Sequence, residues 1–177
     1  SSDVCSCDLQ VIIELGRDDS AQSFMLVMRG GPPGKPVIVY RYHPSRSAAI
    51  PLQYLSGYKG YLQTDGYEGY REVGSLPGIM HVGCWAHARR KFDEAGHASK
   101  KAGSAHEALG RIGKIYRIER ELRAQELTSE AFQRIRKEQV LPILLDFREW
   151  LEEKAPQVPP SLLLGKAVNY ALKEWEK

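Results

Sequence analysis

The chain has 177 residues, of which 42% are hydrophobic and 27% charged, a composition typical of one globular domain or of one domain with an insertion. No apolar run reaches the roughly 20 residues of a membrane span, and the first residues lack the basic start and apolar stretch of a signal peptide. With three cysteines a disulfide framework is not expected, which favours a reducing, cytosolic setting. The net charge of +3 is too small by itself to indicate nucleic-acid binding.

The first half of the chain predicts short β-strands joined by tight turns. Apolar, β-prone runs predict strands at residues 9–15, 24–28 and 36–42, with Gly and Pro turn chemistry before the third. A helix is expected within residues 44–57, capped by Ser45 and stopped by Gly57. Further strands are expected at residues 58–64, ending at Asp65, and at residues 79–82.

The second half predicts helices and carries the basic excess. Residues 1–83 hold 7 Lys and Arg against 8 Asp and Glu, whereas residues 84–177 hold 18 against 14. Helices are expected at residues 86–98, at 105–127, after a Thr128 cap with a bend at Pro142, and at 162–176 after a Ser161 cap. Strands followed by helices predict the α/β class, a mixed sheet with a helical appendage.

Asp65 follows a short predicted strand and precedes a glycine. A carboxylate at the carboxyl end of a strand is where open α/β sheets place ligand-binding groups, and it could hold Mg²⁺ through oxygen. The alternative is that Asp-Gly simply forms a turn. The sequence leaves both interpretations open.

Cys84 and His87 have the spacing of half a zinc site, and Cys5 with Cys7 could supply the other half. The two pairs lie nearly 80 residues apart. We therefore favour a structural role for Cys84 and His87, largely buried and without metal, at a junction between strand and helix.

Basic and aromatic side chains recur in patterns that fit nucleic-acid binding but also fit ordinary packing. Ion pairs with neighbouring acids would make the basic residues a solvated face, and tyrosines at such spacing commonly pack. The candidate phosphate-binding residues are Arg89, Arg90, Lys91, Arg111, Lys114, Arg117, Arg120 and Arg123. The candidate stacking residues, grouped around Asp65, are Tyr54, Tyr58, Tyr61, Tyr67 and Tyr70.

Several motifs taken together resemble the transposase of the bacterial insertion-sequence family numbered sixty-six. The resemblance runs from about Leu9 to the end of the chain. Its motifs are Gly30-Gly31-Pro32-Pro33-Gly34-Lys35-Pro36, Tyr42-His43-Pro44-Ser45-Arg46-Ser47, Leu62-Gln63-Thr64-Asp65-Gly66-Tyr67, Cys84-Trp85-Ala86-His87-Ala88-Arg89-Arg90-Lys91-Phe92, and residues 112–119, 156–160 and 164–167.

The resemblance implies a ribonuclease-H-like catalytic core, a mixed sheet of three antiparallel strands, a helix and further strands. Such transposases use an Asp-Asp-Glu triad and two Mg²⁺ ions, or Mn²⁺, for DNA strand cleavage and transfer. The family's second aspartate falls on Asp65, and Cys84 with His87 looks structural. Residues 1–98 would then be a partial catalytic core, and residues 99–177 a helical insertion after the second aspartate.

Two departures from the family pattern reduce the expected activity. Cys5-Ser6-Cys7 stands where the first aspartate is expected, with Asp8 and Asp3 nearby but out of register, and the family's glutamate would lie beyond Lys177. The chain thus resembles a transposase truncated at both ends. We expect Asp65, with Asp8 as a second candidate, to bind Mg²⁺ weakly and the chain alone not to cut DNA; whether it is an enzyme stays open.

The partners follow from the same resemblance. They are DNA, as element ends and target, with a second copy of the chain or other transposition proteins as further candidates and no membrane, in a cytoplasmic, nucleoid-associated bacterial setting. One alternative is a non-catalytic DNA-binding or assembly module that uses the basic helices. Another is a helical interaction domain with no nucleic-acid role.

Overall fold

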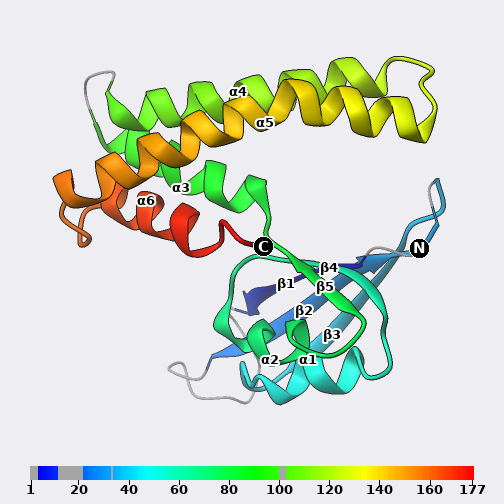
Figure 1. Ribbon diagram of the computed structural model, residues 1–177. Helices are drawn as coiled ribbons and strands as arrows, with labels where there is room; N and C mark the ends of the chain where they lie inside the picture. Colours follow the sequence, from blue (N-terminus) through cyan, green and yellow to red (C-terminus); the bar gives the residue numbers. More distant parts are fainter. Residues whose placement is uncertain (1–3, 12–21, 33, 100–102) are drawn as a thin grey trace. The chain divides into compact units, whose positions relative to one another are not determined.

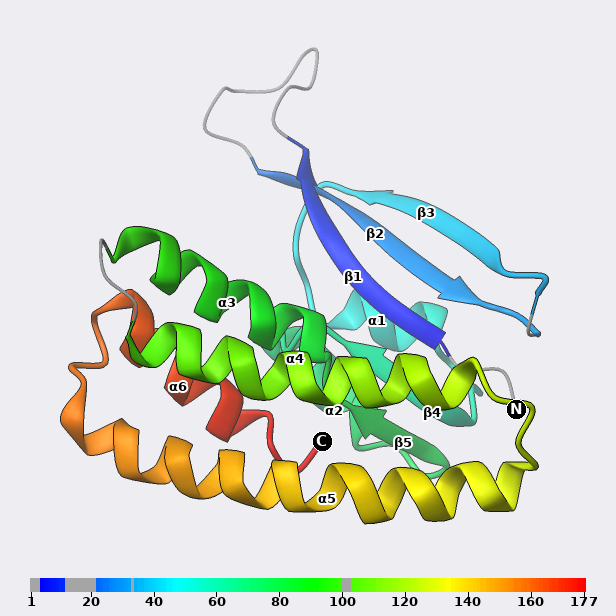
Figure 2. The ribbon, with the colours of Figure 1, turned by 90° about the horizontal axis from the view of Figure 1, so that it is seen from above.

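The computed structural model describes residues 4–11, 22–32, 34–99 and 103–177 (Figures 1 and 2). The chain forms two compact units: Ser1–Cys84 with Lys177, called here the sheet unit, and Trp85–Glu176, called the helical unit. The helix at Trp85–Ala98 belongs to the helical unit, because it contacts two later helices. Within the described residues, no helix combines the length and apolarity needed to cross a membrane.

The sheet unit is built on five strands in the order β3-β2-β1-β4-β5. Strands β1, β2 and β3 pair antiparallel, whereas β4 pairs parallel with β1 and with β5. The predicted meander and the predicted pairing of the fourth strand beside the first are both confirmed by these registers. The strands are β1 Val4–Val11, β2 Ser23–Gly30, β3 Val37–His43, β4 Gly60–Thr64 and β5 Ile79–Val82.

Strand β1 begins at Val4, five residues before the predicted start at Leu9. The prediction relied on the apolar run, but the backbone of the more polar stretch before it pairs with β2 on one side and β4 on the other. Residues 12–15 of the predicted strand lie outside the described residues.

Helix α1 (Ala49–Tyr54) is shorter than expected, and the predicted Ser45 cap is wrong. Instead the Ser47 hydroxyl accepts the Ala49 N–H at 3.3 Å, so the chain turns into the helix later. Gly57, with φ of +75°, ends this segment as predicted. The sequence analysis missed η1 (Glu68–Tyr70) and α2 (Arg71–Gly74), which are too short to show periodicity.

The core of the sheet unit lies between one face of the sheet and helices α1 and α2 (Figure 1). It centres on five buried residues, Leu26, Leu55, Leu62, Tyr70 and Val73. The strand registers put large exposed side chains on the opposite face, which is called here the open face. These are Ile38, Tyr40, Tyr42, Tyr61 and Met80.

The helical unit consists of α3 (Trp85–Ala98), α4 (Ser104–Arg123), α5 (Ser129–Lys154), η2 (Ala155–Gln157) and α6 (Leu163–Lys173). Helices α4 and α5 run side by side in opposite directions (Figures 1 and 2). The Phe147 side chain is fully buried, with its ring centroid about 6 Å from those of Trp85, Phe92, Trp150 and Trp175. The aromatic cluster and the aliphatic residues around it form this unit's own core.

The helix ends follow local chemistry. The predicted Thr128 cap is confirmed, because its hydroxyl accepts the Ala131 N–H at 3.2 Å. Helix α4 ends at Arg123 rather than at residue 127. The predicted Ser161 cap is wrong, since the position before α6 is Leu162 and no side chain caps it. A Cβ on Gly165 would lie 2.1 Å from the Pro159 carbonyl oxygen, so the turn into α6 requires glycine there.

Candidate functional site

Asp65 directly follows β4 at the carboxyl end of the parallel part of the sheet. One carboxylate oxygen, Oδ1, accepts the Tyr67 N–H at 3.0 Å, and Gly66 has a φ of +79°. The turn interpretation is therefore correct: Asp65 closes an Asx turn. An Asx turn needs only one acceptor site of a carboxylate, so the turn by itself leaves the metal-ligand interpretation open.

The β1 backbone lies next to β4, with Cys5 opposite Gln63 and Ser6 opposite Thr64. Asp8 lies two residues further along β1, opposite Leu26 of β2. Its role as a second carboxylate stays a prediction from sequence. Asp3 lies outside the described residues.

The part of the chain that the structure describes does not contain a complete set of metal-ligating side chains. Within those residues, no group of three or more His, Cys, Asp or Glu side chains gathers where a metal could be held. Two-metal chemistry needs several carboxylates converging on the ions. The described residues therefore do not by themselves fit a two-metal centre.

Cys84 and His87 lie at the start of α3, at the predicted junction. Both are half-buried rather than largely buried as expected, because this junction lies at the boundary between two separately packed units. His81, which the sequence analysis did not single out, has a defined polar contact in the sheet: its Nε2 lies 2.8 Å from the Thr64 hydroxyl. A structural role for Cys84 and His87 stays a prediction.

The basic residues of α3 divide into two kinds. Arg89 and Arg90 are exposed. Lys91 is half-buried, with its ammonium 4.9 Å from the centroid of the Tyr170 ring on α6, a cation–π distance. Lys91 therefore contributes to packing between helices, whereas Arg89 and Arg90 present their charge to solvent.

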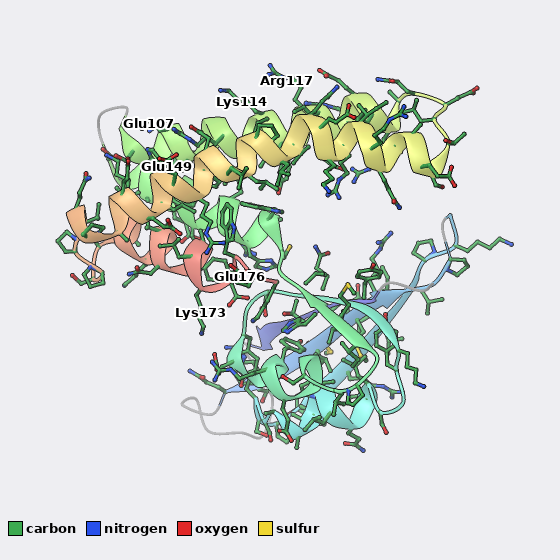
Figure 3. All side chains as sticks on the ribbon, viewed as in Figure 1. Glu107, Lys114, Arg117, Glu149, Lys173 and Glu176 are labelled. Atoms are coloured by element: carbon green, nitrogen blue, oxygen red, sulfur yellow. The ribbon has the colours of Figure 1, made fainter. Side chains whose placement is uncertain are left out.

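The basic stripe of α4 divides in the same way. Arg111 donates to Asp146 at 2.8 Å, and Arg123 donates to Glu119 at 3.1 Å, so the two ends of the stripe are ion-paired. Between them lie Lys114, Arg117 and Arg120, which are exposed and whose side chains make no hydrogen bond or ion pair with any described residue. Figure 3 shows Lys114 and Arg117 pointing away from the α4–α5 contact. These three residues are called here the basic triplet.

The tyrosines around Asp65 mostly pack, as the alternative interpretation held. Tyr70 is buried, and its ring meets Tyr67 edge-on at 6.0 Å between centroids. The Tyr58 hydroxyl donates to the Tyr61 carbonyl oxygen at 2.8 Å. Tyr61 is 45% exposed, on the open face.

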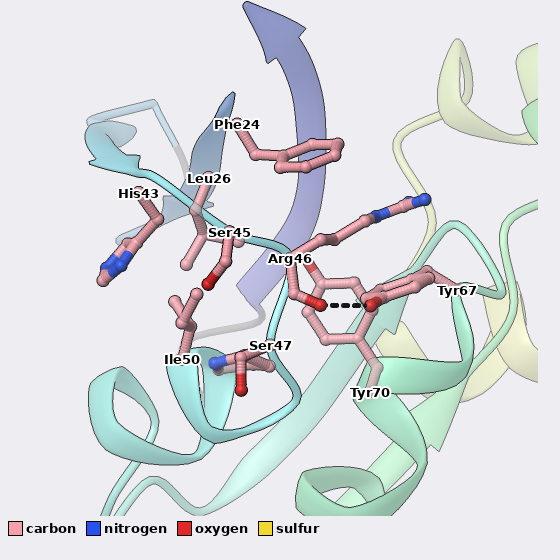
Figure 4. A pocket seen from close by; sticks show the side chains of 10 residues that line it. Phe24, Leu26, His43, Ser45, Arg46, Ser47, Ile50, Tyr67 and Tyr70 are labelled. Atoms are coloured by element: carbon pink, nitrogen blue, oxygen red, sulfur yellow. Dashed lines mark hydrogen bonds between the residues drawn. The ribbon is translucent and has the colours of Figure 1, made fainter. Parts of the chain in front are cut away.

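The sequence analysis missed Arg46 as a site residue. Its guanidinium lies 3.6 Å from the centroid of the Tyr67 ring and 5.6 Å from that of Phe24. These residues help to line a small pocket that is open to solvent (Figure 4). The signal was present in the Tyr42–Ser47 motif, but nothing in the sequence indicated that it would meet the Asp65 turn.

A sequence profile described as "Transposase IS66 family" matches residues 1–177. The match identifies the class of protein as a transposase. The chain belongs to the IS66 transposase family. The chain is also similar to two uncharacterized proteins of Sinorhizobium fredii. It is 31% identical to y4qI over 144 residues, covering 77% of this chain and 26% of the relative. It is 30% identical to y4hP over 157 residues, covering 80% and 28%.

The chain therefore spans only about a quarter of the length of these relatives. No solved structure matches it significantly.

Proposed function

We propose that the chain is part of a transposase catalytic domain, with a ribonuclease-H-like core that contributes Asp65 to metal-dependent DNA strand cleavage and transfer. The supporting observation is the position of Asp65 at the carboxyl end of β4, beside β1, in a sheet of three antiparallel strands followed by two parallel ones. The resemblance predicts this order of strands. The same proposal includes residues 1–98 as part of the catalytic core and residues 99–177 as a helical insertion.

We further propose that these 177 residues alone do not cut DNA. Asp65 by itself would hold Mg²⁺ weakly, because Mg²⁺ gives up its waters reluctantly and is bound well only with several oxygen ligands. Incubation of the purified protein with supercoiled plasmid and Mg²⁺ or Mn²⁺ tests this. We expect no nicking. Nicking that disappears in Asp65→Ala would show that other acids of the chain complete the site.

Weak metal binding can be tested without activity. Mn²⁺ broadens NMR signals of nearby nuclei, so a low Mn²⁺ concentration should broaden the backbone amides around Asp65. Asp65→Asn is the matched variant, because its amide oxygen can still accept the Tyr67 N–H while the negative charge is removed. Equal broadening in both proteins would contradict Asp65 as the ligand.

For DNA binding we propose the basic triplet, Lys114, Arg117 and Arg120, together with Arg89 and Arg90. Exposed cationic side chains without a protein partner can neutralise phosphates without breaking an ion pair. Each neutralised phosphate contributes about 0.9 to the slope of log affinity against log salt concentration. The same residues support the alternative function, a non-catalytic DNA-binding or assembly module. In that case the function would not require Asp65, but it would require the basic triplet.

The salt dependence of duplex binding tests the triplet. Replacing all three residues with glutamine should weaken binding and reduce the salt slope by about 0.9 for each phosphate that is no longer neutralised. Arg148→Gln is the control, because Arg148 donates to Glu152 at 2.9 Å and Glu176 at 2.7 Å. These bonds raise the pKa of its guanidinium, and we expect its removal to leave DNA affinity nearly unchanged. DNA binding that does not depend on salt would contradict both functions.

A further inference from the structure

We propose that two copies of this chain associate by antiparallel pairing of their β3 strands, so that the two five-stranded sheets continue as one. The inference goes beyond the proposed function and does not depend on it. Strand β3 lies on the outside of the sheet (Figure 2), and among the described strands it pairs with β2 alone. The backbone N–H and C=O groups that face away from β2 form a template for a further strand.

Strand β3 lacks the features that usually prevent edge strands from pairing. Natural sheets protect an edge with a very short strand, prolines, bulges or several charges. Strand β3 is seven residues long, contains no proline, and has Arg41 as its one residue of the Asp, Glu, Lys and Arg types. Its register with β2 runs over all seven residues without a bulge. The opposite edge strand, β5, has four residues and is protected by its shortness.

The sequence of β3 is complementary to itself in an antiparallel pair. A pair centred on Tyr40 uses all seven residues, with Tyr40 opposite its own copy and Ile38 opposite Tyr42 of the second copy. These three side chains are exposed and lie together on the open face. Aromatic and β-branched side chains that lie directly opposite each other stabilise a strand pair. Such self-complementarity is what a two-fold symmetric interface requires, so the predicted occupant of this edge is a second copy.

The charges of the sheet unit do not oppose this pairing. In the register centred on Tyr40, Arg41 falls opposite Val39 of the second copy. A register centred on Arg41 would instead place two like charges directly opposite each other, which is destabilising. Residues 1–83 hold 7 Lys and Arg against 8 Asp and Glu, so two sheet units repel each other little.

The area that the strand pair covers predicts a weak dimer. Aromatic side chains contribute about 150–250 Å² each when buried. Because Tyr40 is 61% and Tyr42 44% exposed, these residues of both copies contribute roughly 500 Å² at most. Ile38 and the strand backbones add to this area, but one strand pair stays below the roughly 1,200 Å² of a stable interface. We therefore expect a dissociation constant between about 1 μM and 1 mM.

Cysteine cross-linking of the full chain tests the register. Directly opposite residues of an antiparallel pair have Cα atoms about 4.5–5.5 Å apart, a separation that a disulfide spans. With the three native cysteines replaced by serine, Tyr40→Cys should form a covalent dimer under mild oxidation. Ile38→Cys and Tyr42→Cys should each stay monomeric alone but cross-link when the two proteins are mixed. Met80→Cys is the matched control, because Met80 is 57% exposed on the opposite edge strand, and it should stay monomeric.

Analytical ultracentrifugation measures the dimer without a cross-link. Tyr40→Lys should raise the dissociation constant by about tenfold or more, because it removes the tyrosine contact and places two ammonium groups opposite each other. Met80→Lys should leave the constant unchanged. Both positions are exposed, so either lysine can reach solvent, and circular dichroism checks that each variant folds.

Three outcomes would overturn the proposal. The first is a monomer at every concentration up to about 1 mM. The second is cross-linking of Met80→Cys as complete as that of Tyr40→Cys, which would indicate contact through the open faces instead of the edges. The third is failure of the Ile38→Cys and Tyr42→Cys mixture to cross-link. None of these measurements contains DNA, so their outcome and that of the proposed function are independent.

Discussion

The sheet unit and the helical unit bury their apolar side chains to different extents. The helical unit encloses Phe92, Phe147 and Leu151 completely. In the sheet unit the described core lies on one face, and on the open face Tyr40 is 61% and Met80 57% exposed. Exposed apolar side chains promote association, whereas a closed core supports independent folding. The helical unit should therefore be the more self-sufficient of the two.

The units also differ in how their charged residues can act. A catalytic carboxylate is useful only when other ligands converge on the same ion, and Asp65 has no such cluster among the described residues. Binding of DNA phosphates needs no such convergence, because exposed cations act over a Debye length of about 8 Å at physiological salt. The proposed DNA binding therefore depends only on exposed cations, whereas the proposed chemistry depends on further metal ligands.

The largest effect is expected when the sheet unit and the helical unit are produced as separate proteins. Residues 85–176 expressed alone should give a monomer with a cooperative thermal transition, because their core is closed. Residues 1–84 alone should associate or precipitate through the open face. Size-exclusion chromatography and circular dichroism measure both. A monomeric, cooperatively folding sheet unit would contradict association through the open face.

The next largest effect is expected at Phe147, whose ring contacts the other aromatics of the helical core. Phe147→Ala should lower the free energy of unfolding by about 3–5 kcal/mol, because apolar burial is reduced and a cavity is left. The three tryptophans all lie in residues 85–176, so their fluorescence during urea unfolding reports this unit selectively. Leu145→Ala, at a side chain 60% exposed on the same helix, should change stability by less than about 0.5 kcal/mol.

A smaller effect is expected at Glu119 between α4 and α5. Its carboxylate is 11% exposed and pairs with Arg123 on α4 and Arg136 on α5. Glu119→Gln should cost about 1–3 kcal/mol, because hydrogen bonds to a charged group are removed while both arginines stay partly solvated. The control is Glu121→Gln, at an exposed position two residues along the helix. Equal losses of unfolding free energy in the two variants would mean that the ion pairs of Glu119 do not contribute to stability.

The sequence predicts the elements of this fold better than it predicts the contacts between distant residues. Strand β5 has the predicted bounds, because its apolar run is short and flanked by turns. Strand β1 was predicted too short, since polar residues can pair when neighbouring strands satisfy their backbone groups. The turn at Asp65 was predictable from the Asp-Gly pair. The stacking of Arg46 on Tyr67 was not, because these residues are 21 positions apart and meet only through the tertiary fold.

The smallest predicted change in the free energy of unfolding is a gain rather than a loss. It tests whether the helical unit is packed as closely at its exposed surface as in its core. Gly113 lies inside α4 with nothing within 4 Å of a Cβ built on it. Gly113→Ala should raise the free energy of unfolding by about 0.5–1 kcal/mol, because alanine loses less backbone entropy than glycine in a helix.

Gly165→Ala is the matched substitution in a crowded place. Its new Cβ would meet the Pro159 carbonyl oxygen at 2.1 Å, so the turn must shift and the protein should lose about 1–3 kcal/mol. Tryptophan fluorescence during urea unfolding measures both variants. The same substitution should therefore stabilise one helix of this unit and destabilise another. Destabilisation in both would mean that α4 is covered at Gly113 by something other than solvent.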